Sequence, residues 1–287
     1  MQSQTADIAA YLAFVNWSRR NERIFSSWGK FAQKVFQTRH TILPRSDYYE
    51  AVLRLCGISP RKALSDYRDE LLKNDLVRRN YVGAIEEGRL EKKYRVYEEK
   101  IGRNEGNVVN YYALIREFQP NVVVETGTAA GSMTAWVLAA LEANVKGKLI
   151  SIDLPPVKGK LAMDLTITKA DVGFLVPREY HHRWEYLLGD AKVMLPRVCA
   201  ENEVDVFIHD SLHTRTHMLF EYNVARCLMK PNKVILSDDI LWNRSFFDFV
   251  RSHKLRSLGC ISNPNLGMTV NKFDDYELGV GTGIVRP

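Results

Sequence analysis

Short apolar segments alternate with helical stretches from residue 122 onward, and this alternation constrains the fold more than any other feature. Five segments are expected to be strands: Val122–Thr126, Leu149–Asp153, Trp184–Leu188, Val204–His209 and Val234–Ser237. Their near-continuous Val, Ile and Leu content is typical of strands in a parallel sheet that is covered on both faces. Because strands and helices alternate, the sequence predicts an α/β fold with a doubly wound, mostly parallel sheet.

Every expected strand has an acidic residue at or next to its carboxyl end. These residues are Glu125, Asp153, Asp190, Asp210 and the pair Asp238–Asp239. In a doubly wound sheet, ligands bind outside the carboxyl ends of the strands. One such acid could cap a helix, but acids after all five strands predict a ligand site along this rim.

The turn after the first strand, from Glu125 to Ser132, is rich in small residues. Glycine in a strand-to-helix turn lets a ligand approach the backbone closely. The G-x-G-x-x-G spacing of dinucleotide-binding folds fails at Ala129 and Ser132, whereas the spacing acid-x-Gly-x-Gly-x-Gly fails only at Ala129. An acid in the turn suits a cationic ligand better than a pyrophosphate. A glycine turn with a purely structural role is the alternative.

Two further acids suit a nucleoside ligand. Asp153 follows Gly131 by 22 residues, and a carboxylate there can accept hydrogen bonds from both ribose hydroxyls. Asp190, which precedes Ala191, could accept a hydrogen bond from an adenine amino group. Either acid alone could be an ordinary loop carboxylate, so the prediction depends on the ordered set.

Taken in this order, the segments resemble the class I S-adenosylmethionine-dependent methyltransferases. The group concerned includes cephalosporin-hydroxylase-like proteins and, more distantly, macrolide-sugar O-methyltransferases. The resemblance rests on residues 123–132, 151–155, 172–177, 183–184, 188–190, 207–214 and 236–239, and it covers residues 105–287. It implies a Rossmann-like fold and S-adenosylmethionine as the cofactor. The residues expected to bind this cofactor are Glu125, Gly127, Thr128, Ala129, Gly131, Ser132, Asp153, Asp190, Ala191 and Asp210.

A reaction centre is expected where the fourth and fifth strands end. Asp210 and His213 are three residues apart, so one tight turn would bring them together. The two strands are neighbours in a sheet of this order, so Asp210 could meet Asp238 and Asp239. Three carboxylates with open positions suit Mg²⁺. The resemblance to sugar methyltransferases implies the same metal ligands and makes His213 the general base, although some relatives have Glu where this chain has Asp238.

We therefore expect metal-assisted O-methylation, with His213 and Asp210 as the catalytic residues. A substrate hydroxyl held beside Mg²⁺ would lose its proton to neutral His213 and attack the methyl group of the sulfonium. The expected acceptor is a small hydroxylated molecule, with sugars and glycolipid head groups among the candidates. Two alternatives stay open: Asp238 and Asp239 could cap a helix, and His213 could only hydrogen-bond the backbone.

Two other functions compete with this one. A nucleic-acid methyltransferase would suit the basic N-terminal segment, but no N-P-P-Y-type motif follows the fourth strand, so nucleic acid is disfavoured as a partner. A non-catalytic scaffold that keeps a cofactor-binding fold is the third interpretation. The acids present at every strand end argue against such a scaffold.

The first 104 residues are expected to form a helical N-terminal extension, and residues 105–287 the methyltransferase domain. No segment in the first hundred residues has an alternating strand pattern. Large apolar residues recur at helical spacing between Phe14 and Val35, opposite a basic face. Such a helix could pack on the domain or on a second subunit of a homo-oligomer, or it could lie on a membrane surface.

The sequence also bears on location and on the substrate pocket. The cysteines form no C-x-x-C pair, and neither a signal-peptide pattern nor a membrane-spanning apolar run is present, so we expect a cytoplasmic protein. Residues 155–183 are numerous enough to form a lid over the cofactor. Trp242 and Asn243 could line the substrate pocket, whereas His209 and His217 are expected to be structural.

Overall fold

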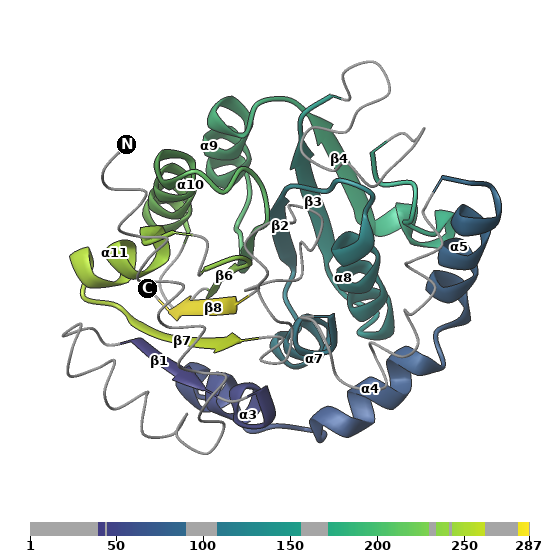
Figure 1. Ribbon diagram of the computed structural model, residues 1–287, viewed down its shortest axis with the longest axis horizontal. Helices are drawn as coiled ribbons and strands as arrows, with labels where there is room; N and C mark the ends of the chain where they lie inside the picture. The colour runs from purple at the N-terminus through teal and green to yellow at the C-terminus, as the bar shows by residue number, and fades with distance from the viewer. Residues whose placement is uncertain are drawn as a thin grey trace, which may run out of the picture.

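The computed structural model describes residues 40–43, 45–89, 108–155, 172–229, 234–240, 243–261 and 281–286. The strands are β1 (His40–Leu43), β2 (Val122–Thr126), β3 (Lys148–Asp153), β4 (Trp184–Leu188), β5 (Val206–His209), β6 (Val234–Ser237), β7 (Arg256–Ile261) and β8 (Gly281–Arg286). The helices are α3 (Arg45–Cys56), α4 (Leu64–Leu72), α5 (Asp75–Glu86), α7 (Val108–Phe118), α8 (Ser132–Ala143), the 3₁₀ helix η3 (Arg178–Arg183), α9 (Ala191–Glu201), α10 (Arg215–Leu228) and α11 (Ser245–Ser252). The strands form one sheet in the order β1-β7-β8-β6-β5-β2-β3-β4 (Figure 1).

The five central strands confirm the predicted sheet. β2 pairs in parallel with β3 and β5, β4 pairs in parallel with β3, and β6 with β5. The bounds of β2, β4 and β6 are those predicted, whereas β3 begins one residue earlier, at Lys148, and β5 begins at Val206. Among the strands described, β8 alone runs antiparallel to its neighbours. The fold is therefore a Rossmann-like, mostly parallel α/β fold.

Side chains of the central strands alternate between two hydrophobic cores. Along β2, Val123 belongs to one core and Val124 to the other, and along β5 the same holds for Ile208 and Phe207. The first core joins the sheet to α3, α4, α5, α7 and α8, and the second joins it to α9, α10 and α11 (Figure 1). Successive residues of a strand point to opposite faces. A strand that is covered on both faces is therefore largely apolar at successive positions, which is the pattern seen in the sequence.

The N-terminal part contains a strand that the sequence did not predict. β1 pairs in parallel with β7, with His40 opposite Ser257, so it forms one edge of the sheet. The expectation of no strand in the first hundred residues is thus wrong, because four residues are too few to show an alternating pattern and their partner lies far along the chain. The helix expected between Phe14 and Val35 lies outside the described residues. The domain division at residue 104 stays a prediction.

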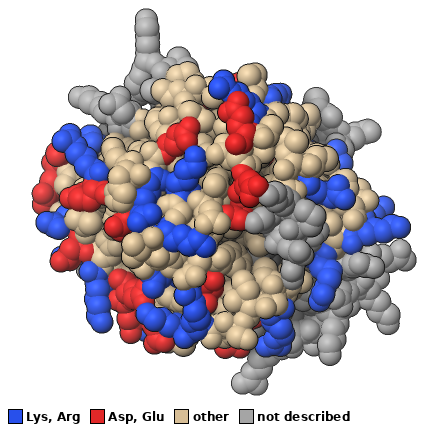
Figure 2. Space-filling model, turned by 180° about the vertical axis from the view of Figure 1, so that it is seen from behind, with Lys and Arg blue, Asp and Glu red and all other residues tan. Residues whose placement is uncertain are grey.

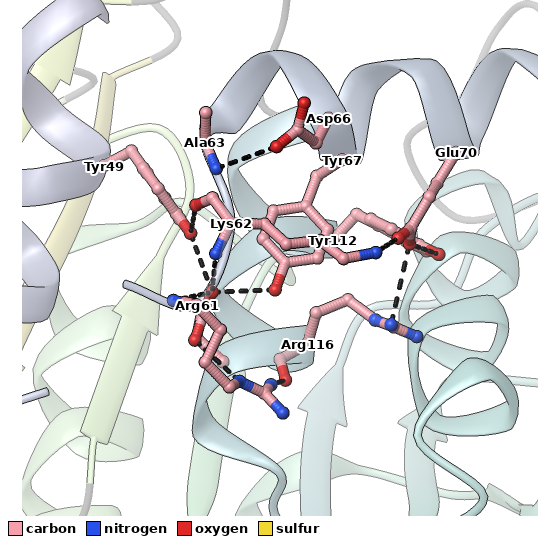
Figure 3. Close-up of polar contacts among 10 residues, drawn as sticks. Tyr49, Arg61, Lys62, Ala63, Asp66, Tyr67, Glu70, Tyr112 and Arg116 are labelled. Carbon is pink, nitrogen blue, oxygen red and sulfur yellow. Dashed lines mark hydrogen bonds and ion pairs between the residues drawn. The ribbon is translucent and has the colours of Figure 1, made fainter. Parts of the chain in front are cut away.

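A buried carboxylate ties the N-terminal helices to α7. Glu117 Oε1 accepts hydrogen bonds from the hydroxyls of Tyr67 at 2.7 Å and Tyr49 at 3.0 Å. Its Oε2 accepts from Arg61 Nε at 3.0 Å. In Figure 3 the side chains of Tyr49, Arg61 and Tyr67 converge on one common acceptor. Burial alone would raise the pKa of Glu117, but these hydrogen bonds hold it below its usual value, so the group is a carboxylate.

The surface of the described residues carries charges of both signs. Ion pairs join Arg78 to Asp75 at 2.8 Å and Arg197 to Glu201 at 2.9 Å. Figure 2 shows Lys and Arg interspersed with Asp and Glu over one face of the molecule. Binding to nucleic acid favours a continuous basic surface, and the described part of this face does not offer one. Each helix in the described ranges is also too short or too polar to cross a membrane.

Candidate functional site

The turn between β2 and α8 has a backbone that few side chains allow. The φ angle is +88° at Gly127, +46° at Ala129 and +86° at Gly131, values that glycine adopts without strain and alanine does not. A Cβ atom on Gly127 would lie 1.9 Å from the backbone oxygen of Asp210. The turn therefore lies directly against the residue that follows β5. The predicted cofactor turn and the predicted reaction centre are thus adjacent.

Asp153 holds this turn from the end of β3. Its Oδ2 accepts hydrogen bonds from the backbone N–H groups of Thr128 at 2.8 Å and Ala129 at 2.7 Å. Its Oδ1 accepts from the backbone N–H of Leu154 at 2.6 Å. Because a carboxylate has about four acceptor positions, capacity remains for a further donor. The contact of Asp153 with ribose hydroxyls stays a prediction.

The structure places Glu125 beneath the turn, fully buried. Its Oε2 accepts hydrogen bonds from the hydroxyls of Thr134 and Ser151, both at 2.8 Å. Burial raises the pKa of Glu125 to about 7, in spite of these hydrogen bonds. Its Oε1 is also buried and has no hydrogen-bond partner among the described residues. The contact of Glu125 with the cofactor stays a prediction, and Oε1 is the atom that could make it.

Three other predicted cofactor residues lie at the starts of helices. Ser132 begins α8, and its hydroxyl hydrogen-bonds with the hydroxyl of Tyr81 on α5, a residue that sequence analysis missed. Asp190 is the N-cap of α9 and accepts from the backbone N–H of Lys192 at 2.8 Å. Ala191 is the first residue of that helix and is half-buried. Capping is the ordinary use of Asp at such a position, so the geometry explains Asp190 without a ligand.

The acids after β5 and β6 gather at one level of the rim. The backbone N–H of Asp210 donates to Thr126 at 2.9 Å, and that of Asp238 donates to His209 at 2.9 Å. These two bonds extend the hydrogen-bond pattern of the sheet by one residue beyond the ends of β5 and β6. Burial and then the charges of Asp238 and Asp239 raise the pKa of Asp210 well above its usual value. Burial and then Asp238 do the same for Asp239. The structure thus brings the three carboxyl groups together.

His213 lies against the second acid of the pair. Its Nε2 is 3.5 Å from Asp239 Oδ2, and its side chain is 17% exposed. Burial and then His209 lower the pKa of His213 to about 3, so its ring is neutral near pH 7. The sequence placed His213 beside Asp210, which stays a prediction, and the structure shows a contact of His213 with Asp239. Asn243, expected in the substrate pocket, donates from Nδ2 to the carbonyl oxygen of His213 at 3.0 Å; its neighbour at position 242 lies outside the described residues.

Tyr111 on α7 is a further polar residue near the acids. Its hydroxyl is buried without a hydrogen-bond partner among the described residues. Burial raises the pKa of Tyr111 well above its usual value, and the charges of Asp238 and Asp210 are the next largest causes. A buried polar group without a partner is uncommon, so this hydroxyl has unused hydrogen-bonding capacity close to the acids. Sequence analysis missed Tyr111 because α7 precedes the first central strand and carries no motif.

The metal prediction receives mixed support from the geometry. Within the described ranges, no three or more His, Cys, Asp or Glu side chains are arranged to hold a metal ion. The oxygen donors of Asp210, Asp238 and Asp239 are nevertheless the type that Mg²⁺ prefers. Their mutual repulsion, visible in the raised pKa values of Asp210 and Asp239, is also what a cation would relieve. The donor chemistry fits Mg²⁺, and the observed arrangement is not a closed ligand set.

Several solved structures are similar to this chain. Cofactor-bound Rv0187 from MTB is 14% identical, with 74% of this chain and 90% of that chain covered and a TM-score of 0.47. SAH-bound methyltransferase PaMTH1 from Podospora anserina is 12% identical, covering 86% and 98%, with a TM-score of 0.46. The O-methyltransferase from Bacillus cereus in complex with SAH is 11% identical, covering 91% and 97%, with a TM-score of 0.43. We base no conclusion on these likenesses, because the TM-scores are below 0.5.

The central part of the chain has a match at the level of a protein family. No curated protein matches the chain. Residues 124–240 match the family model of a methyltransferase domain. This segment runs from β2 to the residues after β6, so it contains the glycine turn, Asp153 and the acids of the rim. Over this segment the chain is therefore similar to methyltransferase domains.

Proposed function

We propose that the protein transfers a methyl group from S-adenosylmethionine to a hydroxyl group of a small molecule. The observation that carries this proposal is the close packing of Gly127 against Asp210. The turn predicted to bind the cofactor therefore lies beside Asp210, close to the acid Asp239 that contacts His213. Methyl transfer needs the acceptor oxygen in line with the sulfonium, and adjacent sites supply that alignment. Carboxylates and a neutral imidazole are suited to removing a proton from a hydroxyl.

The cofactor is proposed to lie along the carboxyl ends of β2, β3 and β4. The proposed contacts are with Glu125, Gly127, Thr128, Ala129, Gly131, Ser132, Asp153, Asp190, Ala191 and Asp210. The positive φ angles of the turn support this placement, as does the grip of Asp153 on two of its N–H groups. So does the buried Oε1 of Glu125, which lacks a partner among the described residues. Such an acceptor suits the positive charge of the cofactor.

His213 is proposed as the general base. The hydroxyl oxygen attacks the methyl carbon, the bond from that carbon to sulfur breaks, and the hydroxyl proton passes to a ring nitrogen of His213. The products are a methyl ether and S-adenosylhomocysteine. The neutral ring can accept a proton at pH 7. Asp239, 3.5 Å away, would stabilise the imidazolium that forms and raise the basicity of the ring when ionised.

Mg²⁺ is proposed as a second cofactor, held by Asp210, Asp238 and Asp239. The support is the oxygen chemistry of these three partly buried acids and their repulsion, which, after burial, raises the pKa values of Asp210 and Asp239. When bound, the ion supplies positive charge that favours the ionised form of the substrate hydroxyl. With the ion bound, Asp210, Asp238 and Asp239 would be ionised. The contribution of the fold is to hold these three side chains close together.

The acceptor is proposed to be a hydroxylated small molecule, with sugars among the candidates. The mixed charges on the described part of the face in Figure 2 support a small acceptor over nucleic acid. A homo-oligomer in the cytoplasm, with residues 1–104 as a helical extension of the domain, is proposed from the sequence alone.

Thermal unfolding with S-adenosylhomocysteine tests the proposal, with NAD as the control ligand and each with and without Mg²⁺. A ligand at 100 times its Kd stabilises by about 2.7 kcal/mol, which is a shift of about 5–10 °C in Tm for this size. We expect that shift with S-adenosylhomocysteine and not with NAD. A further Mg²⁺ effect should be absent in Asp239→Asn and present in Asp75→Asn, which changes an exposed acid paired with Arg78. No shift with S-adenosylhomocysteine would contradict the proposal.

A further inference from the structure

α10 carries a buried glutamate whose acceptor positions are filled. Glu221 has no exposed surface. Its Oε2 accepts hydrogen bonds from Thr126 Oγ1 at 2.7 Å and from His209 Nδ1 at 2.6 Å. Its Oε1 accepts from Ser211 Oγ at 2.9 Å and from His217 Nε2 at 2.8 Å. Two donors on each oxygen use all of the roughly four acceptor positions of a carboxylate.

This arrangement determines which ring nitrogens carry protons. Burial alone would raise the pKa of Glu221, but His209 and His217 hold it below its usual value, so the group is ionised. An ionised carboxylate only accepts, so His209 donates from Nδ1 and His217 donates from Nε2. The other ring nitrogen of His209, Nε2, is buried without a partner among the described residues. A bare nitrogen tolerates that position better than an N–H group would.

The partners of this carboxylate surround the proposed reaction centre. Thr126 ends β2 and His209 ends β5, while Ser211 directly follows Asp210. The ring of His209 meets the ring of His213 edge-on, with centroids 5.2 Å apart and an interplanar angle of 69°. The carboxylate therefore contacts the residues on both sides of Asp210 and, through one ring, the proposed base.

The next residue of α10 supports the neighbouring strand. The hydroxyl of Ser237, the last residue of β6, donates to the carbonyl oxygen of Asp238 at 2.9 Å. Since that hydroxyl has one proton, the 2.6 Å bond between it and the hydroxyl of Tyr222 is donated by Tyr222. Two successive residues of α10 thus fix the ends of both strands that bear the acids.

We propose that Glu221 is a positioning residue for methyl transfer, which fixes the tautomer of His209 and, through His209 and Ser211, the places of His213 and Asp210. The role assigned to His213 rests on the proposed function. The hydrogen bonds of Glu221 and the resulting protonation of His209 do not, so they can be tested separately.

Nitrogen NMR of the full chain, labelled with ¹⁵N in its seven histidines, tests the geometry. Single His→Gln variants assign the signals of His209, His213 and His217. In the wild type we expect His209 protonated on Nδ1 and His217 protonated on Nε2. A wild-type His209 that carries its only proton on Nε2 would overturn the proposal, and this outcome needs no Glu221 variant to fold.

Glu221→Gln is the decisive variant, because an amide offers one acceptor oxygen and adds two donors. We expect the His209 signal to move toward the Nε2-protonated form and the His213 signal to shift with it. Glu117→Gln is the matched control, since it changes another buried glutamate that accepts several hydrogen bonds, but on α7 and from Tyr49, Arg61 and Tyr67. The control should lose stability and leave the His209 and His213 signals in place. Glu221→Asp, which keeps the charge, should restore part of the wild-type pattern.

Steady-state kinetics test whether the hydrogen bonds of Glu221 affect methyl transfer. With S-adenosylmethionine and a panel of methyl glycosides, Glu221→Gln should lower kcat at least tenfold and change the KM for S-adenosylmethionine less than twofold. Equal His213 shifts in the two glutamate variants, or a kcat that does not fall in Glu221→Gln, would overturn the positioning role. If the wild type transfers no methyl group and binds no S-adenosylhomocysteine, the proposed function fails. The NMR signals of the histidines still test the hydrogen bonds of Glu221 in that case.

Discussion

Gly173 donates its backbone N–H to the carbonyl oxygen of Ala129 at 2.8 Å, so the segment before η3 braces the turn between β2 and α8. The φ angle of Gly173 is +77°, and a Cβ atom there would lie 2.4 Å from the ring of Trp184. Gly173→Ala should therefore strain the backbone and displace either the indole or the turn. We expect a loss of about 1–3 kcal/mol of folding stability and at least tenfold weaker binding of S-adenosylhomocysteine. Urea unfolding and calorimetry measure the two effects.

Gly83→Ala is the control for this prediction. Gly83 lies inside α5, has no heavy atom within 4 Å of an added Cβ and is not among the residues with positive φ. Alanine there should stabilise the helix by about 0.5–1 kcal/mol and leave ligand affinity unchanged. Binding by Gly173→Ala as tight as that of the wild type would show that the brace does not matter for the turn.

Asp153→Asn tests the link between β3 and the turn. The variant keeps one acceptor oxygen and loses the charge that receives three backbone N–H groups. Hydrogen bonds to charged groups contribute about 1.5–3 kcal/mol, so we expect affinity for S-adenosylhomocysteine to fall about 10- to 100-fold. Asp75→Asn, which removes an exposed acid paired with Arg78, should bind as the wild type does. Equal affinities of the two variants in calorimetry would contradict the role of Asp153.

The central strands and the positions of the acids were predictable because both depend on local pattern. A strand covered on both faces is apolar at successive positions, as Val122, Val123 and Val124 are, and its end is marked where acids and glycines begin. The same locality explains what failed. The four residues of β1 carry no local pattern that predicts their pairing with Ser257 and its neighbours in β7. The pairing of these two strands is set by tertiary packing.

The surroundings of Glu125 and Glu221 could not be predicted from the sequence. Glu125 was expected to bind the cofactor, but whether a strand-end acid faces a ligand or the layer beneath depends on partners such as Thr134 on α8. Glu221 resembles any helical glutamate in the sequence. Its one available signal was His217, four residues earlier and on the same helix face. A buried hydrogen bond of that kind becomes recognisable only once burial is known.

Tyr111→Phe removes a buried hydroxyl that has no partner among the described residues. Deleting an unsatisfied polar group costs little and can stabilise, so we expect folding stability to stay equal or rise by up to about 1 kcal/mol. If the hydroxyl serves a ligand at the acids, methyl transfer should fall while stability does not. Tyr67→Phe is the matched control, because it removes a hydroxyl that donates to Glu117. It should lose about 1–3 kcal/mol, and equal losses in chemical denaturation of the two variants would contradict this account.

His213 makes folding stability depend on pH. Its pKa is about 3 in the folded protein, chiefly because of burial, and about 6.5 in an unfolded chain. Between these values the unfolded state binds more protons, so stability is fully present above about pH 6.5 and is lost as the pH falls toward 3.

His213→Gln removes this contribution and serves as the test. Between pH 7 and pH 5, the wild type should lose up to about 2 kcal/mol more stability than His213→Gln does. Urea unfolding at the two pH values measures the difference, and groups that titrate in both proteins largely cancel. His181→Gln is the control, because His181 is an exposed residue of η3, and its pH dependence should follow that of the wild type. Parallel pH profiles for wild type and His213→Gln would mean that the ring of His213 is not held neutral by burial, and the assignment of a neutral base beside Asp239 would then fail with it.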